Sequence, residues 1–173
     1  MSLDAVKKAI RDVPDFPEKG IIFKDITPVL NDPELFRTVV KEFAARYKDR
    51  GIDKIAAVES RGFIFGSALA CELGAGLVPV RKKGKLPAET IEASYALEYG
   101  TATLEIHTDA IRKGERVLII DDLLATGGTA EATASMVKKL GGDIVEIAFL
   151  IELAFLKGRD RLAGCQVFAP IVY

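Results

Sequence analysis

Apolar residues along the chain repeat at two different periods, and the alternation between these periods predicts alternating helices and strands. The clearest helical stripe has a spacing of four residues and predicts a helix from Asp32 to about Arg50. Its start is typical of helices, because a capping acid is followed by proline at the first position. The apolar members of this stripe are Leu35, Val39, Phe43 and Tyr47.

Shorter apolar runs, separated by glycine, proline and charged residues, predict the remaining elements. Strands are expected over 55–58, 76–80, 117–120, 144–151 and 166–172, with a hairpin of two strands over 93–98 and 102–107. Helices are expected over 2–12, 62–73, 129–140 and 155–162. The proline-punctuated segment 14–30 is expected to be irregular and to cover the core.

This order of elements indicates an α/β fold, with an open, mainly parallel twisted sheet flanked by helices. The apolar strands lack clean alternation, which fits a parallel sheet that is covered on both faces. We expect one domain over 1–173, with a small N-terminal hood that includes 1–30 and a flexible β-hairpin lid over 84–103. Ligands on such sheets bind beyond the carboxyl ends of the strands.

Composition and charge narrow the range of partners. Hydrophobic residues make up 49% of the 173 residues, which fits a globular chain, and the net charge is −1. This balance argues against broad binding to nucleic acid or to a membrane surface. The sequence has neither a secretory signal nor an apolar run long enough to span a bilayer, so we expect a cytoplasmic protein without membrane association.

The few cysteine and histidine residues do not suggest a disulfide framework or a zinc site. Cys71 and Cys165 fit a reducing cytoplasm, with a single structural disulfide as the alternative. His107 is interpreted as a polar residue at a strand end, with a pyrophosphate contact as the alternative.

The segment 117–130, VLIIDDLLATGGTA, carries the strongest chemical signal. An apolar strand runs into Asp121 and Asp122, and a turn of small residues then leads into a helix. Main-chain N–H groups of such a turn, together with the helix N-terminus, suit a phosphate group. The carboxylates suit hydroxyl groups. The alternative is an ordinary strand-to-helix turn with capping acids.

Neither the common ATP loop nor a dinucleotide-binding G-x-G-x-x-G is present. The acidic pair followed by Thr-Gly-Gly-Thr instead resembles the site with which type I phosphoribosyltransferases bind phosphoribosyl pyrophosphate. Two further strand ends are basic. Arg61 follows one strand at a helix start, where a cation is unfavourable unless it meets an anion, and RKKGK follows another. The alternatives are a surface arginine and a solvated loop.

The resemblance extends over nearly the whole chain in order. The segments that carry it are PDFPEKGIIFKDITPVL, SRGF, RKKGKLP, ASYALEYG, LEIHTDAI, VLIIDDLLATGGTA and IELAFLKGR, and together they resemble the adenine phosphoribosyltransferase family. This resemblance implies transfer of ribose 5-phosphate from phosphoribosyl pyrophosphate to N9 of adenine. AMP and pyrophosphate would be the products, in purine salvage. It also implies Mg²⁺ bound through the leaving pyrophosphate, no direct protein ligands to that metal, and a homodimer.

The resemblance also implies roles for individual residues. Asp121 and Asp122 would contact the ribose hydroxyls, Glu98 would be the catalytic carboxylate near the purine, and Tyr99 would pack beside it. The 5-phosphate would be held by Ala125, Thr126, Gly127, Gly128 and Thr129, and pyrophosphate by Arg61, Arg81, Lys82 and Lys85, some of them across a dimer interface. The base would contact Ile22, Phe23, Lys24 and Leu153.

Two of these assignments have open alternatives. Glu98 alternates with Ala96 along an expected strand and could simply face solvent. Some relatives have arginine in place of Lys24, which matters only if the base contact is made by the side chain.

Two other functions are compatible with the phosphate loop. A hypoxanthine, guanine or xanthine phosphoribosyltransferase would share it but would read an oxo group on the base. A regulator that only senses phosphoribosyl pyrophosphate would not need Glu98.

Overall fold

The computed structural model describes residues 1–96 and 100–173, and the chain forms two compact units, 1–45 and 46–173. The first unit contains α1 (Leu3–Ala9), β1 (Arg11–Pro14), β2 (Ile22–Asp25), α2 (Thr27–Asn31) and most of α3 (Pro33–Tyr47). The predicted helix with the four-residue stripe is confirmed as α3, and its stripe residues are buried.

The expectation of an irregular segment over 14–30 is wrong, and the predicted first helix is too long. β1 and β2 form an antiparallel pair, in which Asp12 stands opposite Lys24 and Val13 opposite Phe23. The connection turns through positive φ angles at Asp15 and Gly20, of 55° and 93°. Prolines in a sequence usually argue against a strand, so this segment was expected to be irregular. Here one proline ends a strand and another lies in the turn, and neither interrupts the pairing of the two strands.

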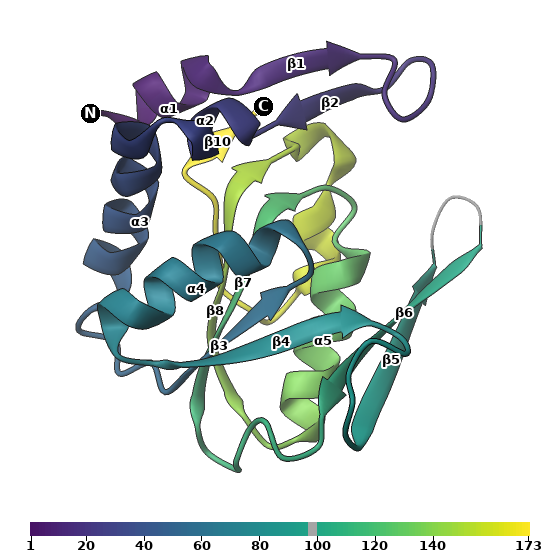
Figure 1. Ribbon diagram of the computed structural model, residues 1–173. Helices are drawn as coiled ribbons and strands as arrows, with labels where there is room; N and C mark the ends of the chain where they lie inside the picture. The colour runs from purple at the N-terminus through teal and green to yellow at the C-terminus, as the bar shows by residue number, and fades with distance from the viewer. Residues whose placement is uncertain (97–99) are drawn as a thin grey trace. The chain divides into compact units, whose positions relative to one another are not determined.

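The second unit is built on an eight-stranded sheet with the order β10-β8-β7-β3-β4-β6-β5, and β9 also pairs with β8 (Figure 1). Neighbours from β10 to β4 are parallel, whereas β4, β6 and β5 pair antiparallel. The strands are β3 (Lys54–Val58), β4 (Gly76–Lys82), β5 (Thr90–Ala96), β6 (Thr101–His107), β7 (Arg116–Leu124), β8 (Asp143–Glu152), β9 (Val167–Phe168) and β10 (Ile171–Val172). The predicted α/β class and the hairpin of β5 and β6 are confirmed.

Two helices cover the sheet, α4 (Arg61–Leu73) and α5 (Gly128–Lys139). α4 packs on β3 and β7, whereas α5 packs on β5, β6, β7 and β8 (Figure 1). Gly66 of α4 lies so close to the sheet that an added Cβ would be 2.6 Å from Cβ of Ala57 and 3.1 Å from Cγ2 of Ile120. The neighbouring residues Ala56 and Ile119 belong to the core that α5 shares. Because strand side chains alternate, the two helices lie on opposite faces.

Three predicted elements differ from the structure. The central strand continues through the acidic pair to Leu124, because its pairing with β8 extends to Glu152. The segment 155–162 forms two 3₁₀ helices instead of one helix, η1 (Ala154–Leu156) and η2 (Gly158–Leu162), which Lys157 separates with a φ of 52°. The predicted last strand is two short ones, β9 and β10, which pair with different parts of β8.

A buried carboxylate joins the end of α3 to the sheet. Glu146 accepts hydrogen bonds from Nε and Nη2 of Arg46, at 2.6 and 2.8 Å, and from the Tyr47 hydroxyl at 2.6 Å. Burial opposes ionisation of Glu146, but the hydrogen bonds from Arg46 and Tyr47 and the Arg46 and Arg50 charges offset it and lower its pKa.

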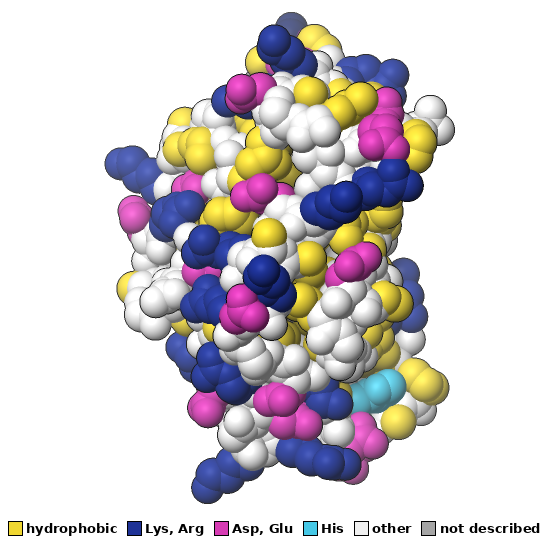
Figure 2. Space-filling model, turned by 90° about the vertical axis from the view of Figure 1, so that its left-hand side faces the viewer, with side chains coloured by type: hydrophobic (Ala, Val, Ile, Leu, Met, Phe, Trp, Pro, Cys, Tyr) yellow, Lys and Arg dark blue, Asp and Glu magenta, His cyan; other side chains and the backbone are white. Residues whose placement is uncertain are grey.

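The surface carries charges of both signs. The face displayed in Figure 2 shows Lys and Arg side chains beside Asp and Glu, in keeping with the net charge of −1. Every helix within the described residues is too short or too polar to cross a membrane. Cys71 and Cys165 are both free thiols, so the alternative of a disulfide between them is not realised.

Candidate active site

A cavity of about 240 Å³ opens where β3, β4 and β7 end. This is the sheet edge at which α/β proteins bind ligands. Five residues that the sequence predicted for one site contribute to its wall: Arg61, Lys82, Asp121, Asp122 and Thr129. The wall is completed by residues that the sequence did not single out: Val58, Glu59, Ser60, Tyr95 and Leu104.

The acidic pair lies within β7, not after it. Oδ1 of Asp121 accepts the main-chain N–H of Asp122 at 2.8 Å, and Oδ2 of Asp122 accepts Nε of Arg61 at 2.5 Å. Burial, together with the adjacent negative charge of Asp122, raises the pKa of Asp121 well above its ordinary value. The wall therefore holds two carboxyl groups in different environments, of which Asp122 is ion-paired.

The first turn of α4 can reach β7 only because residue 62 is glycine. A Cβ on Gly62 would lie 2.8 Å from the carbonyl oxygen of Ile120 and 3.0 Å from Oδ1 of Asp121. Either contact would push the helix away from the strand. The glycine in the SRGF segment thus sets the distance between Arg61 and the acidic pair.

The loop from Ala125 to Thr129 borders a second, smaller hollow of about 70 Å³. Asp121 and Thr129 contribute to the walls of both hollows. Gly127 has a φ of +86°, a conformation that glycine adopts readily, and α5 begins at the next residue. Main-chain N–H groups and the positive end of the helix dipole therefore meet at this hollow, an arrangement that favours an anion.

Gly158 of η2 packs against the main chain of the loop Ala125–Thr129. A Cβ on Gly127 would overlap the carbonyl oxygen of Gly158 in η2, and a Cβ on Gly158 would overlap the carbonyl oxygen of Ala125. The ring of Tyr95 lies over the other side of the loop, with its Cδ2 atom 2.9 Å from where a Cβ on Gly128 would be. The sequence reasoning missed Gly158 and Tyr95, although both lie in segments that carry the family resemblance.

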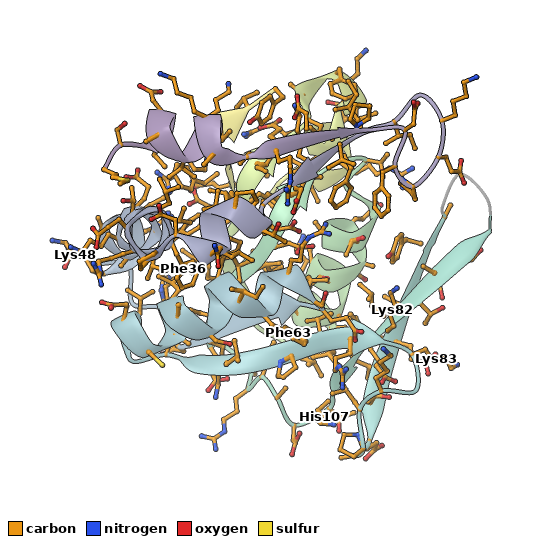
Figure 3. The ribbon with its side chains drawn as sticks, turned by 45° about the horizontal axis from the view of Figure 1, so that its top comes forward. Phe36, Lys48, Phe63, Lys82, Lys83 and His107 are labelled. Atoms are coloured by element: carbon orange, nitrogen blue, oxygen red, sulfur yellow. The ribbon has the colours of Figure 1, made fainter. Side chains whose placement is uncertain are left out.

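The cationic side chains of the basic segment 81–85 make contacts in different places. Lys82 lines the cavity, whereas Nζ of Lys83 binds Oε2 of Glu92 on β5 at 2.8 Å. Figure 3 shows the two lysines beside the hairpin, with Lys83 on its outer side. Arg81 and Lys85 do not line the cavity but bind Glu59 in its wall, at 3.0 and 3.2 Å.

Glu59 is a component of the site that sequence reasoning missed. Besides the Arg81 and Lys85 cations, it accepts the main-chain N–H of Lys82 at 3.1 Å. Burial opposes its ionisation, but these three partners offset the effect and lower its pKa. Its position directly after β3, one residue before Ser60 and two before Arg61, is the signal that could have identified it.

The other predicted residues lie elsewhere. Leu153 follows β8, and its N–H donates to the carbonyl of Leu124 at 2.9 Å. In the first unit, Lys24 forms a 2.6 Å ion pair with Asp12, and the Phe23 ring packs edge-on against Phe16. Ile22 beside them is an exposed apolar residue. Glu98 and Tyr99 lie outside the described residues.

His107 is not part of the cavity wall. It stands at the base of the hairpin, opposite Thr90, where Nε2 accepts the main-chain N–H of Ala88 at 3.3 Å (Figure 3). The interpretation of His107 as a polar strand-end residue is thus consistent with its position.

Comparison with known proteins agrees with this geometry. Residues 27–163 match the model of the phosphoribosyl transferase domain. The adenine phosphoribosyltransferase of Geobacter metallireducens is 58% identical over 99% of this chain and 100% of its own. That of Thermotoga maritima is 55% identical over 97% of each chain.

Solved structures give the same result. The crystal structure of adenine phosphoribosyltransferase from Thermoanaerobacter pseudethanolicus has a TM-score of 0.97 at 54% identity, covering 99% of this chain and 100% of that one. The enzyme from Saccharomyces cerevisiae has a TM-score of 0.93 at 42% identity over 96% and 97% of the two chains, and was crystallised with an imino-altritol bisphosphate and adenine. This chain therefore belongs to the adenine phosphoribosyltransferase family.

Proposed function

We propose that the cavity at the end of β7 is where this enzyme transfers ribose 5-phosphate from phosphoribosyl pyrophosphate to N9 of adenine, forming AMP and pyrophosphate. The observation that carries this assignment is the adjacency of the two hollows. One is bordered by the anion-suited loop Ala125–Thr129 and the other by Arg61 and Lys82, with Asp121 common to both. A pentose with a phosphate at each end needs groups in this order.

The 5-phosphate is assigned to the loop Ala125–Thr129. Its N–H groups and the start of α5 offer donors and a favourable dipole. Gly127 and Gly128 permit the close approach of the main chain that a phosphate requires. In this assignment, the contact between Gly127 and Gly158 keeps the loop in shape before the ligand arrives.

Bond breaking places opposite charges on the two products of cleavage. As the C1–O bond to pyrophosphate breaks, the sugar gains oxocarbenium character and the leaving group gains negative charge. Asp122, which is ion-paired with Arg61, stabilises the charge on the sugar, and Asp121 contacts the sugar hydroxyls. Arg61 and Lys82 stabilise the pyrophosphate, with Arg81 and Lys85 behind them. As the bond from C1 to N9 of adenine forms, the proton on N9 passes to Glu98, which we assign as the general base.

The contacts with the base are assigned to Ile22, Phe23, Lys24 and Leu153, together with Tyr99. The support is the family resemblance of these segments. Lys24 binds Asp12 through its side chain, which leaves the main chain of β2 as its route to the purine. The lid over 84–103 would exclude water from the sugar cation when it closes.

Mg²⁺ is proposed as the cofactor. Within residues 1–96 and 100–173, no three Asp, Glu, His or Cys side chains cluster as a cage, but the cavity wall carries carboxylate oxygens from Asp121 and Asp122. Oxygen-rich surroundings of this kind suit Mg²⁺, which keeps several of its waters and would be held mainly through the substrate pyrophosphate, without a direct protein ligand. When bound, the ion would neutralise charge on the leaving pyrophosphate.

We further propose a cytoplasmic homodimer. The free thiols of Cys71 and Cys165 fit a reducing compartment. The dimer is inferred from the family alone.

The proposed activity is tested by incubating the chain with adenine, phosphoribosyl pyrophosphate and Mg²⁺ and following AMP by chromatography. AMP should form, and hypoxanthine in equal amount should compete weakly. Efficient formation of the hypoxanthine nucleotide with little AMP would contradict the proposed base specificity. Absence of any nucleotide, while phosphoribosyl pyrophosphate still binds, would favour a sensor.

A further inference from the structure

Strand β6 carries a buried carboxylate that has no part in the chemistry described above. Glu105 is 3% exposed and does not contribute to the cavity wall. Its Oε1 atom accepts the main-chain N–H groups of Lys85 and Leu86, at 2.8 and 2.7 Å. These are the last two residues of the segment Arg81–Leu86, which we call the basic loop.

The basic loop and the residues after it are fixed along β6 at several points. The N–H of Lys83 donates to the carbonyl of Thr103 at 3.1 Å, and that of Ala88 donates to Nε2 of His107 at 3.3 Å. Glu105 lies between these two points along β6. Of the three acceptors, the Thr103 carbonyl, the Glu105 side chain and the His107 ring, only Glu105 is a carboxylate. Hydrogen bonds to an ionised acceptor are roughly twice as strong as neutral ones.

The surroundings of Glu105 favour its ionised form. Burial opposes its ionisation, but the main-chain N–H groups of Leu86, Gly84 and Lys85 and the nearby His107 offset it and lower its pKa. The four cations between Arg81 and Lys85 would otherwise repel one another and favour an extended, solvated loop. Glu105 beneath the loop and Glu59 beside it supply two compensating negative charges.

We propose that Glu105 is a positioning residue for pyrophosphate binding. It does not touch the substrate. By accepting the N–H groups of Lys85 and Leu86, it holds the basic loop in the shape that brings Lys82 to the cavity and Arg81 and Lys85 to Glu59. This inference rests on the proposed role of the basic loop in binding pyrophosphate.

Two conservative variants distinguish the effect of side-chain length at residue 105 from the effect of its negative charge. Glu105→Asp keeps the charge but is one methylene shorter, so its carboxylate is drawn back from the two N–H groups. Glu105→Gln loses the charge but keeps an oxygen at the same reach. The matched control is Glu92→Asp, because Glu92 stands opposite Glu105 in the sheet and binds the same loop through Lys83, outside the cavity.

For each variant, KM for phosphoribosyl pyrophosphate, KM for adenine and kcat are measured, with the Kd for inorganic pyrophosphate from calorimetry. Glu105→Asp should raise KM for phosphoribosyl pyrophosphate and the Kd for pyrophosphate by about tenfold, with kcat within about twofold, because misplacement of a binding group weakens contacts steeply. Glu105→Gln should raise both constants by about three- to tenfold, because its neutral oxygen accepts the same N–H groups more weakly and no longer offsets the cations of the basic loop. Glu92→Asp should stay within about threefold of the parent. KM for adenine should not change in any of them.

Three results would overturn the inference. The first is an unchanged KM in Glu105→Asp. The second is a defect of equal size in Glu92→Asp, which would mean that any change at this cross-strand pair disturbs the basic loop. The third is a loss of kcat that follows lower thermal stability with no change in KM, which would mean a merely structural role. Lys82→Ala, measured in parallel, tests the underlying assignment: if it leaves pyrophosphate binding intact, the proposed function of the basic loop fails as well.

Discussion

Nε of Arg61 donates to Oδ2 of Asp122 across 2.5 Å, which joins the first residue of α4 to the end of β7. The two residues are assigned to different parts of one substrate, Arg61 to the pyrophosphate and Asp122 to the ribose. Their direct contact fixes the spacing between the two subsites. Gly62 makes the contact possible, because any side chain there would meet β7.

Replacing Asp122 with asparagine removes a negative charge beside the sugar and keeps the shape. We expect kcat to fall by about 30- to 1,000-fold, the equivalent of about 2–4 kcal/mol for one preorganised electrostatic group. Asp109→Asn, at an exposed position of the same unit, should leave kcat unchanged. A reduction of less than threefold in Asp122→Asn would remove this charge from the account.

Asp121→Asn should stabilise the folded chain while lowering activity. Burial and the Asp122 charge raise the pKa of Asp121 above 3.8, so its ionised form is disfavoured by folding. Asparagine avoids that cost and can still accept the N–H of Asp122. The melting temperature should therefore rise, by about 2–4 °C for each kcal/mol gained.

The difference in stability between the parent and Asp121→Asn should depend on pH in a defined direction. Below pH 3.8, Asp121 is neutral in both the folded and the unfolded chain, so the parent and Asp121→Asn should be equally stable. The advantage of the variant should grow as pH rises toward the raised pKa of the folded chain. Melting curves between pH 3 and pH 8 test this, and a variant that is less stable at neutral pH than at acid pH, relative to the parent, contradicts it.

Much of the fold follows from local sequence signals, and the exceptions have physical causes. The stripe of α3, the hairpin of β5 and β6, and the strand before the acidic pair were predictable, because burial repeats along them with a regular period. The hairpin of β1 and β2 was not, since its prolines and turn conceal short strands that are stabilised partly by cross-strand ion pairs such as Arg11 with Asp25.

The candidate site divides in the same way. Asp121 and Arg61 follow from their positions at strand ends, which bring them to one sheet edge. Glu105 and Gly158 act on loops distant in sequence, through contacts that no local pattern encodes. Glu98 remains a prediction from the resemblance.

Gly158→Ala tests the support beneath the phosphate loop. A methyl group there would overlap the carbonyl oxygen of Ala125 and press on Leu124, so the loop must shift. We expect KM for phosphoribosyl pyrophosphate to rise by about tenfold or more, since a displaced loop loses its aligned donors. Gly164→Ala is the control, because a Cβ at that residue has no neighbour within 4 Å and adds only backbone strain at its φ of +85°. Equal behaviour of the two variants would argue against a supporting role for Gly158.

Glu98→Gln tests the assigned general base. The variant should bind phosphoribosyl pyrophosphate normally and lose kcat by about 100-fold or more, the usual contribution of a positioned proton acceptor. Single-turnover kinetics with adenine would separate binding from chemistry. Unchanged turnover would remove Glu98 from the mechanism.

The central claim is that the end of β7 binds a phosphorylated ribose, and a crystal structure of the chain with AMP tests it most directly. The account predicts the phosphate among the N–H groups of Ala125–Thr129 and the ribose hydroxyls within hydrogen-bond distance of Asp121 and Asp122. AMP bound elsewhere, or bound with its ribose away from both carboxylates, would contradict it.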